Sequence, residues 1–331
     1  MKKLGITTTI PYEIAFAAGY IPIDLNNIFI TSPDYLKYIE VAENHGFPKS
    51  MCSWIKGIYG AALTNNIDTI VGVTEGDCSN THSLTEIFKL NNIDVIDFKY
   101  PTSHRIDLIT KSLNNFAEKL GTTIEKSEII RNSLLSLREK IAKIDQLCNE
   151  EKISSFYSHL YQVSCSDFNG DWYSFEKEID NFLITNNNNF PKKHKIRAAF
   201  IGVPPMYSSL YEYLESLGCI VVYNEIQREF AFPRAKYAKN IFEQYHDYSY
   251  PYSLDFRYNI IFKEIKLRNI DCIIHYTQSF CHKSIDNIYF NKKFDIPIIN
   301  IEGDRSTEVD SRTKLRLESF IDMVISRKAE K

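Results

Sequence analysis

Short apolar blocks alternate with stretches of helical periodicity along the chain, and this alternation predicts an α/β fold with parallel sheets. Seven blocks are the strand candidates: Ile21–Leu25, Thr69–Val73, Val95–Phe98, Ala198–Gly202, Ile220–Tyr223, Cys272–Tyr276 and Ile298–Ile301. Between the third and the fourth block, from Ile106 to Phe182, apolar residues recur at helical spacing instead.

The length and one polar run divide the chain. A chain of 331 residues favours two domains. Asn186–Asn189, followed by Phe190-Pro191, is a linker candidate because four Asn residues cannot build a core. We expect a first α/β lobe over residues 1–105, a helical connecting region with the Asn-rich linker over 106–190, and a second α/β lobe over 191–331. Both lobes should be Rossmann-like, doubly wound and mainly parallel.

The two halves repeat a pattern. Tyr12-Glu13 precedes Gly19 and a predicted strand, and Tyr211-Glu212 precedes Gly218 and a strand with the same spacing. The strand Ala198–Gly202 leads the second half, and the first half offers no room for its equivalent. We therefore expect one lobe architecture used twice, with an extra leading strand in the second lobe.

A cysteine closes the repeated pattern in each half. Cys78 follows Asp68 by ten positions, and Cys281 follows Asp271 by ten. Both cysteines should lie just past the carboxyl end of a parallel strand, which is the edge where open α/β sheets bind ligands. The start of a helix there would lower the pKa of a thiol and favour the thiolate that a metal needs.

The composition narrows the classes of function. Charged residues make up 24% of the chain and its net charge is −3, so no broad basic surface is predicted for nucleic acid or an anionic membrane. No window approaches the ~18 apolar residues of a membrane-spanning helix, and the start lacks a signal-peptide cleavage site. Seven cysteines at irregular spacing do not suit a disulfide framework. A reducing, cytoplasmic location is expected.

Four of the cysteines have a structural interpretation. Cys219 and Cys272 sit inside apolar strands, where a thiol behaves as a small hydrophobic group. Cys148 lies on a charged helix and Cys165 in a polar stretch, and neither has a partner at ligand spacing.

The other three cysteines are candidate metal ligands. Cys52, Cys78 and Cys281 each stand in a loop-like junction among polar or small residues. Three thiolates would suit an iron–sulfur cluster with one iron left open, and zinc bound by three Cys with His82 or His282 is the alternative. Their spacing alone does not decide between these metals.

At these residues the chain resembles the 2-hydroxyacyl-CoA dehydratase family, which includes the benzoyl-CoA reductase cluster subunits and the double-cubane cluster proteins. The resemblance spans nearly the whole length and is carried by these segments in order: Pro11–Pro22, Cys52-Ser53-Trp54 with Gly60, Asp68–Val71 leading to Asp77-Cys78, Phe280-Cys281, Ile296–Asp304 and Arg316–Phe320.

The resemblance implies two Rossmann-like lobes with one 4Fe–4S cluster in the cleft, bound by Cys52, Cys78 and Cys281. It also implies a homologous second subunit or a homodimer, and an ATP-dependent activase that delivers one low-potential electron. The implied reaction is dehydration of an acyl-CoA through a ketyl radical, which makes the chain the iron–sulfur subunit of a lyase or reductase.

Two other functions stay open for such a chain. One is a double-cubane reductase of small molecules, and the other is a non-catalytic, cluster-carrying electron-transfer partner. The chain departs from the family in being short, and in having the neutral or weakly basic run Ser79–His82 where a charged residue is common. Catalytic residues stay unassigned: Asp77 is expected to cap a helix, and His275 or His282 to tune the cluster or to be an ordinary polar group.

Overall fold

The computed structural model describes residues 2–186, 194–305 and 307–330, so most of the predicted Asn-rich linker lies outside the described residues. The chain forms two compact units, and each is assembled from three separate stretches. The first unit comprises Met1–Glu139, Ser164–Lys177 and Glu229–Ser253, and the second comprises Lys140–Val163, Glu178–Arg228 and Leu254–Lys331.

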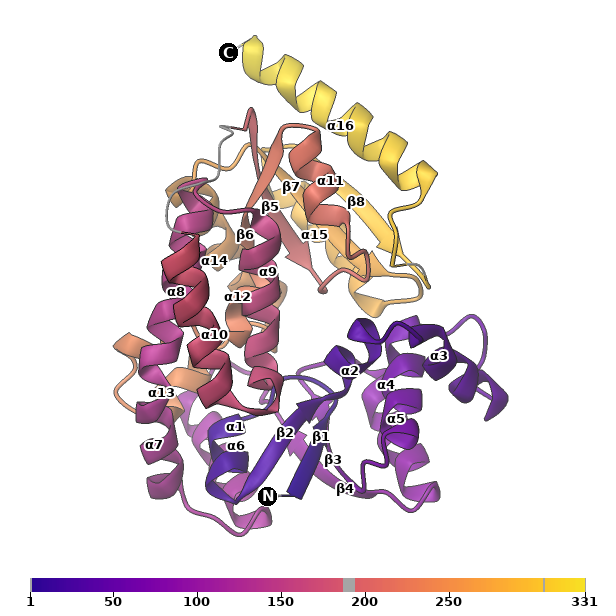
Figure 1. The fold of residues 1–331 in the computed structure, drawn as a ribbon, viewed down its shortest axis with the longest axis vertical. Coiled ribbons are helices and arrows are strands. Elements are labelled where there is room, and N and C mark those ends of the chain that lie inside the picture. The colour runs from indigo at the N-terminus through magenta and orange to yellow at the C-terminus, as the bar shows by residue number, and fades with distance from the viewer. Residues whose placement is uncertain (1, 187–193, 306, 331) are drawn as a thin grey trace. The chain divides into compact units, whose positions relative to one another are not determined.

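Each unit contains one four-stranded parallel sheet (Figure 1). The first sheet has the order β2-β1-β3-β4, formed by β1 (Lys2–Ile6), β2 (Tyr20–Asp24), β3 (Thr69–Glu75) and β4 (Asp94–Lys99). The second has the order β6-β5-β7-β8, formed by β5 (Ile196–Gly202), β6 (Cys219–Asn224), β7 (Cys272–Gln278) and β8 (Ile298–Gly303). The predicted α/β fold with two parallel, Rossmann-like lobes is confirmed.

All seven predicted strands are present, but the expected difference between the lobes is wrong. Strand β1 leads the first sheet and pairs with β2 and β3, as β5 pairs with β6 and β7. Its pattern is hard to read because Lys2 and Lys3 are exposed and only Leu4, Gly5 and Ile6 are buried. The two lobes therefore have the same strand order, and the repeat seen in the sequence is a repeat of the whole sheet.

The repeated Tyr-Glu and Gly positions have the same local structure in both units. Helices α1 (Tyr12–Ala17) and α11 (Leu210–Ser216) each end shortly before a glycine with positive φ, +81° at Gly19 and +78° at Gly218. A strand starts at the next residue in both cases. The left-handed conformation turns the chain back into the sheet, and glycine adopts it without the steric cost of a Cβ.

Helices connect the strands. The first unit also contains α2 (Leu25–Thr31), α3 (Tyr35–Asn44), α4 (Ser53–Thr64), α5 (Asn80–Leu90), α6 (Ile106–Lys119), α7 (Ile124–Ser133) and α13 (Ile241–His246), and the second also contains α9 (Ser155–Val163), α14 (Leu254–Leu267), α15 (Asp286–Lys293) and α16 (Ser311–Ala329). Three helices contribute residues to both units: α8 (Leu135–Asn149), α10 (Trp172–Thr185) and α12 (Glu225–Phe230). The helical stretch predicted from Ile106 to Phe182 is thus present, and it lies between β4 and β5.

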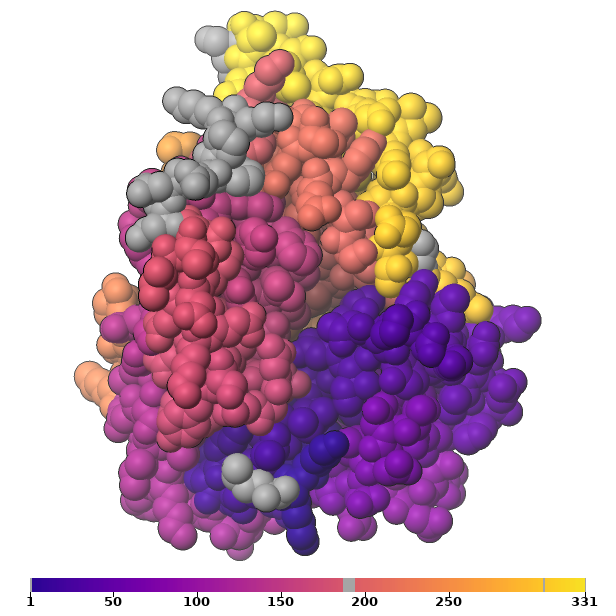
Figure 2. Space-filling model, viewed as in Figure 1, coloured from indigo at the N-terminus to yellow at the C-terminus, as the bar shows by residue number. Residues whose placement is uncertain are grey.

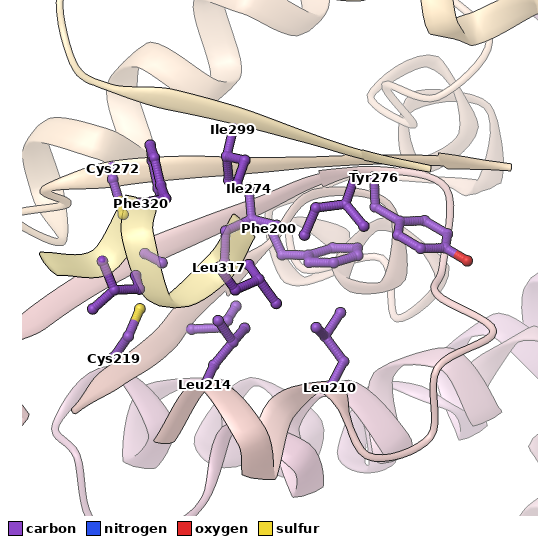
Figure 3. Packing of buried hydrophobic residues seen from close by; sticks show 14 of the residues in the cluster. Phe200, Leu210, Leu214, Cys219, Cys272, Ile274, Tyr276, Ile299, Leu317 and Phe320 are labelled. Atoms are coloured by element: carbon purple, nitrogen blue, oxygen red, sulfur yellow. The ribbon is translucent and has the colours of Figure 1, made fainter. Parts of the chain in front are cut away.

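The core of the second unit lies on both faces of its sheet. On one face, side chains of β5, β7 and β8 meet Leu210 and Leu214 of α11 and Leu317 and Phe320 of α16 (Figure 3). Side chains of α14 and α15 form a second cluster with the other face. Helix α16, yellow in Figure 2, buries only a narrow stripe and leaves its other residues on the surface. Helices on both faces are the mark of a doubly wound sheet.

None of the helices in the described part of the chain combines the length and the hydropathy that crossing a membrane requires.

Candidate functional site

Cys78 lies at the point where the strand order of the first sheet reverses. Strand β3 ends at Glu75, Cys78 follows three residues later, and α5 begins at Asn80. The carbonyl oxygen of Cys78 accepts a hydrogen bond of 3.0 Å from the backbone N–H of Thr81, so the cysteine is part of the turn that starts the helix. In the order β2-β1-β3-β4, the chain winds outward in opposite directions from β1 and β3, and ligands bind at the carboxyl edge beside such a switch point.

Cys281 occupies the equivalent position in the second unit. Strand β7 ends at Gln278, and Cys281 follows three residues later. Its N–H donates to the carbonyl of Gln278 at 2.9 Å, and its carbonyl accepts from the N–H of Ser284 at 3.1 Å. A 3-10 turn, η4 (His282–Ile285), then leads into α15. The predicted place of both cysteines, just past a parallel strand and at the start of helical structure, is confirmed.

Cys52 lies in the first unit at the start of α4. It is 7% exposed and belongs to an apolar cluster against which Cys78 also packs. The fully buried Lys56 secures the loop before it: its Nζ donates to Glu43 Oε1 at 2.8 Å and to the carbonyl of Lys49 at 3.1 Å. Burying an ammonium group is costly unless it is paired, so this arrangement fixes the loop that carries Cys52.

The electrostatics at Cys281 differ from our expectation. Burial raises the pKa of the Cys281 thiol, and the backbone N–H and the charge of Lys283 oppose this only in part. The start of a helix was expected to lower the pKa of this thiol. The four residues of the 3-10 turn η4 follow Cys281 directly, however, and so short a turn has a smaller dipole than a full α-helix. A metal ion would itself favour the thiolate, because coordinated thiols are deprotonated.

The remaining four cysteines are buried. Cys148 is 1% exposed and donates from Sγ to the carbonyl of Val221 at 3.3 Å. Cys165 is also 1% exposed, and burial raises the pKa of both thiols far above the usual range. Cys219 and Cys272 are fully buried in the core of the second unit, as expected (Figure 3). All seven cysteines lie in the described part of the chain, and none of them forms a disulfide there.

Asp77 has a different role from the one expected. The N-cap of α5 is Ser79, so the interpretation of Asp77 as the helix cap is wrong. The carboxylate of Asp77 instead accepts a hydrogen bond of 2.8 Å from the hydroxyl of Tyr250. Glu75, on the same turn, forms an exposed ion pair of 2.9 Å with Lys99.

The histidines near the predicted ligands fall into two groups. His82 and His282 are exposed. His275 is 2% exposed on β7, and its Nδ1 lies 3.1 Å from Asn300 Oδ1. Burial lowers the pKa of His275. Partial desolvation and the charge of Lys283 lower the pKa of the more exposed His282, so the neutral imidazole is favoured in both.

The first unit contains a buried polar cluster that the sequence analysis missed. Glu13 is fully buried, pairs with Arg138, and accepts hydrogen bonds from Gln244 Nε2 at 2.7 Å and from the hydroxyl of Tyr245 at 2.5 Å. These residues come from two of the three stretches of chain that make up the unit. The repeated Tyr12-Glu13 pair was the available signal, but it gave no indication of the partners.

A second buried pair of the first unit consists of two carboxyl groups. The backbone N–H of Asp24, at the end of β2, donates to Asp167 Oδ2 at 2.7 Å. Burial and the neighbouring charge of Asp24 raise the pKa of Asp167 to about 7, and burial also raises the pKa of Asp24.

In the second unit, Arg257 is buried between two carboxylates. Its Nε and one terminal nitrogen donate to Glu225 at 2.7 and 3.0 Å, and the other terminal nitrogen donates to Asp286 at 2.9 Å. Glu225 Oε2 also accepts from the N–H of Gly202, the last residue of β5. This cluster fixes the carboxyl edge of the second sheet on the side of α14 and α15.

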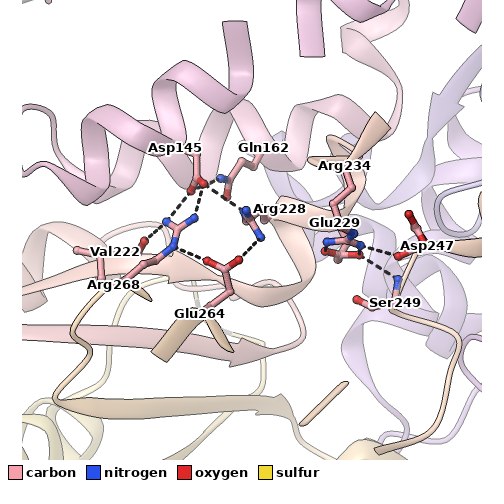
Figure 4. A network of polar contacts seen from close by, with 10 residues as sticks. All are labelled: Asp145, Gln162, Val222, Arg228, Glu229, Arg234, Asp247, Ser249, Glu264 and Arg268. Carbon is pink, nitrogen blue, oxygen red and sulfur yellow. Dashed lines mark hydrogen bonds and ion pairs between the residues drawn. The ribbon is translucent and has the colours of Figure 1, made fainter. Parts of the chain in front are cut away.

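A further network of the second unit links three helical segments through Asp145 of α8 (Figure 4). Arg228 of α12 donates to Asp145 at 3.1 Å, and Arg268, just after α14, donates to it at 2.5 Å. Glu264 accepts from both arginines. Every charge in this network has a partner of opposite sign, which is typical of a structural ion-pair network.

The sequence profile of one protein family, described as 2-hydroxyglutaryl-CoA dehydratase, D-component, matches residues 7–324. The chain belongs to this family. The match includes Cys52, Cys78 and Cys281, together with every strand of both sheets except β1, which ends at Ile6. No individually curated protein matches the chain.

Membership of the dehydratase family confirms the resemblance, whereas the set of metal ligands is not decided by it. In the ranges that the structure describes, no three side chains of His, Cys, Asp or Glu lie close enough together to hold a metal ion. Cys52 and Cys78 belong to the first unit, and Cys281 belongs to the second. The ligand set therefore stays a prediction, supported in its chemistry by the affinity of thiolates for iron–sulfur clusters.

Proposed function

We propose that this member of the dehydratase family binds one 4Fe–4S cluster through Cys52, Cys78 and Cys281 and is the cluster-bearing subunit of an enzyme acting on an acyl-CoA. One observation carries the proposal: Cys78 and Cys281 each lie three residues past a central strand, at the switch point of sheets with the same strand order. Cysteines serving only as core residues would not need equivalent places at a ligand-binding edge.

The cluster, when bound, would supply low-potential one-electron chemistry. The role of this chain is then to hold three of its irons through thiolates and to leave the fourth without a protein thiolate. A dehydratase of this kind works with a homologous second subunit or a second copy of the chain, and with an ATP-dependent activase as electron donor. The support for these partners is membership of a family of dehydratase components. The cytoplasmic location stays a prediction.

Metal analysis tests the proposal directly. The chain is purified without oxygen, reconstituted with ferrous iron and sulfide, and analysed for iron, labile sulfide and zinc. We expect about four irons and four sulfides per chain, with a broad visible absorbance that dithionite bleaches. Stoichiometric zinc without sulfide would contradict the proposal, and about eight irons per chain would indicate a double-cubane protein.

Cysteine variants test the ligand set. Cys52→Ser, Cys78→Ser and Cys281→Ser should each lose most of the iron and sulfide, because a hydroxyl is a poor cluster ligand. Cys148→Ser and Cys165→Ser are the matched controls and should keep both. A variant at Cys281 that retained a full cluster would show that the ligand set is wrong.

A further inference from the structure

A segment from much later in the chain, which includes Tyr250 and Pro251, packs against the turn that carries Cys78. Gly76 has φ +83°, and a Cβ built there would lie 2.6 Å from Tyr100 Cβ and 2.7 Å from Pro251 Cβ. Such distances are shorter than any normal carbon contact, so Tyr100 and Pro251 enclose the turn at the position of Gly76. All three residues belong to the first unit.

Tyr250 joins the same turn through a hydrogen bond. Its hydroxyl donates to Asp77 Oδ1 at 2.8 Å, and its side chain is 8% exposed. The ring of Tyr250 lies 6.3 Å from that of Tyr248, which in turn packs 5.3 Å from the ring of Tyr100. Aromatic packing thus orients the hydroxyl toward the residue immediately before Cys78.

The segment that supplies Tyr250 is itself fixed. Glu229 binds Arg234 through two hydrogen bonds and accepts a third, of 2.9 Å, from the N–H of Ser249 (Figure 4). Arg234 also donates to the carbonyl of Asp247 at 2.5 Å. Because Glu229 is 1% exposed, these charged hydrogen bonds are shielded from water and hold the residues just before Tyr250 in one conformation.

We propose that Tyr250 is a positioning residue for Cys78, and that it acts through Asp77. A hydrogen bond from a fixed hydroxyl to the neighbouring carboxylate restricts the backbone of the turn and hence the direction of the thiol. Partners outside the ligand shell commonly orient metal ligands in this way. The purpose of the contact, to prepare Cys78 for a cluster, rests on the proposed function. The contact itself does not.

The first test uses the metal-free protein and the reactivity of single thiols. The chain is treated with iodoacetamide under reducing, anaerobic conditions, and the alkylation of Cys78 and Cys52 is followed separately by mass spectrometry. In Tyr250→Phe, Cys78 should react about five-fold faster than in the unmodified chain, while Cys52 should react at the same rate. A hydrogen bond to a charged group is among the stronger hydrogen bonds in proteins, and its loss should let the turn expose the thiol more often.

The control and a double-mutant cycle separate positioning from general loosening. Tyr252→Phe removes a hydroxyl from a buried tyrosine of the same segment and should leave the rate at Cys78 unchanged. If Tyr250 acts through Asp77, Tyr250→Phe should add nothing further in an Asp77→Ala background. Equal rates at Cys78 in Tyr250→Phe and in the unmodified chain would overturn the inference, and so would full additivity in the cycle.

The second test uses the reconstituted protein. A ferrous chelator should remove iron from Tyr250→Phe about ten-fold faster than from Tyr252→Phe, in the range typical of outer partners of metal ligands. If the unmodified chain binds no cluster, the proposed function fails, and the alkylation rates alone decide the role of Tyr250. If the cluster forms but iron release is equal in both variants, the positioning role for the cluster is wrong.

Discussion

The two sheets have the same strand order, yet the turns that carry Cys78 and Cys281 are held in different ways. In the first unit, side chains of Tyr100, Tyr250 and Pro251 enclose the turn at Gly76 and Asp77. In the second unit, Phe280 is 63% exposed and has φ +65°. That turn is instead held by the backbone, since the N–H of Ser279 donates to the carbonyl of Gly303 on β8 at 2.7 Å.

The residues that end strands β2 and β6 differ as well. Asp24 pairs in register with Ile6 of β1, as Asn224 pairs with Phe200 of β5, so the two residues occupy equivalent places. Asp24 lies beside a second carboxyl group, whereas Asn224 accepts a hydrogen bond of 2.7 Å from the hydroxyl of Tyr211. A shared topology thus fixes where the polar edge lies, while the side chains set its charge separately in each unit.

The largest effect is expected at Arg257, because the second unit buries this cation between two carboxylates, whereas the buried Lys56 of the first unit pairs with only one. Arg257→Met leaves Glu225 and Asp286 buried without their cation and should lower the free energy of unfolding by about 3–5 kcal/mol. Chemical denaturation of the second unit measures it. The triple variant Arg257→Met, Glu225→Gln, Asp286→Asn removes all three charges and should recover more than half of the loss. A loss below about 1 kcal/mol in the single variant would show that the cluster is solvated.

The enclosed turn of the first unit should not tolerate a side chain at Gly76. Gly76→Ala combines the cost of a positive φ, about 1 kcal/mol, with a clash against two side chains, and should destabilise by about 3 kcal/mol. Gly121→Ala is the matched control, because Gly121 has φ +70° but no atom within 4 Å of a built Cβ. It should cost only about 1 kcal/mol in thermal unfolding. Equal losses of stability in both variants would show that Tyr100 and Pro251 do not enclose the turn tightly.

The carboxyl pair should make the first unit less stable as the pH rises. The folded protein retains the proton of Asp167 up to about pH 7, whereas the unfolded chain releases it near the ordinary value of 3.8. Stability from this pair is therefore complete below about pH 4, falls between pH 4 and 7, and stays lost above. Thermal unfolding at several pH values measures the slope.

Asp24→Asn gives the first unit the residue found at the equivalent place in the second. It removes one charge of the pair and keeps an oxygen that can accept from the N–H of Asn26, which donates to Asp24 Oδ1 at 2.8 Å. The fall in stability with pH should become shallower, and the variant should be about 1 kcal/mol more stable than the unmodified chain at pH 8. An unchanged dependence of stability on pH would mean that the charge of Asp24 does not contribute to the raised pKa of Asp167.

The smallest effect is expected at Phe280, where the second unit places a bulky residue in a left-handed conformation. Phe280→Gly relieves the strain of about 1 kcal/mol but gives the unfolded chain more freedom, so the two terms nearly cancel. The unfolding temperature should change by less than about 3 °C. A large loss would mean that the exposed ring makes a contact that stabilises the fold.

The sequence alone determined most of the sheet architecture. Seven strands and the repeated spacing from Asp68 to Cys78 and from Asp271 to Cys281 could be read because strands are short apolar blocks and each repeat is local in the chain. The eighth strand was missed because only Leu4, Gly5 and Ile6 are buried in β1, too few for a recognisable apolar block. Its existence depends on pairing with β2 and β3, which a local pattern does not report.

The partners of the polar residues were decided only by the tertiary structure. Tyr250 meets Asp77, and Asp167 meets Asp24, across separations of 173 and 143 residues. Each contact depends on how stretches remote in sequence return to the same unit, and no periodicity encodes such a meeting. The sequence could therefore place Cys78 at the edge of a sheet, because the strand before it is local. What surrounds Cys78 was fixed by long-range packing, because enclosure requires side chains from elements that only the folded chain brings together.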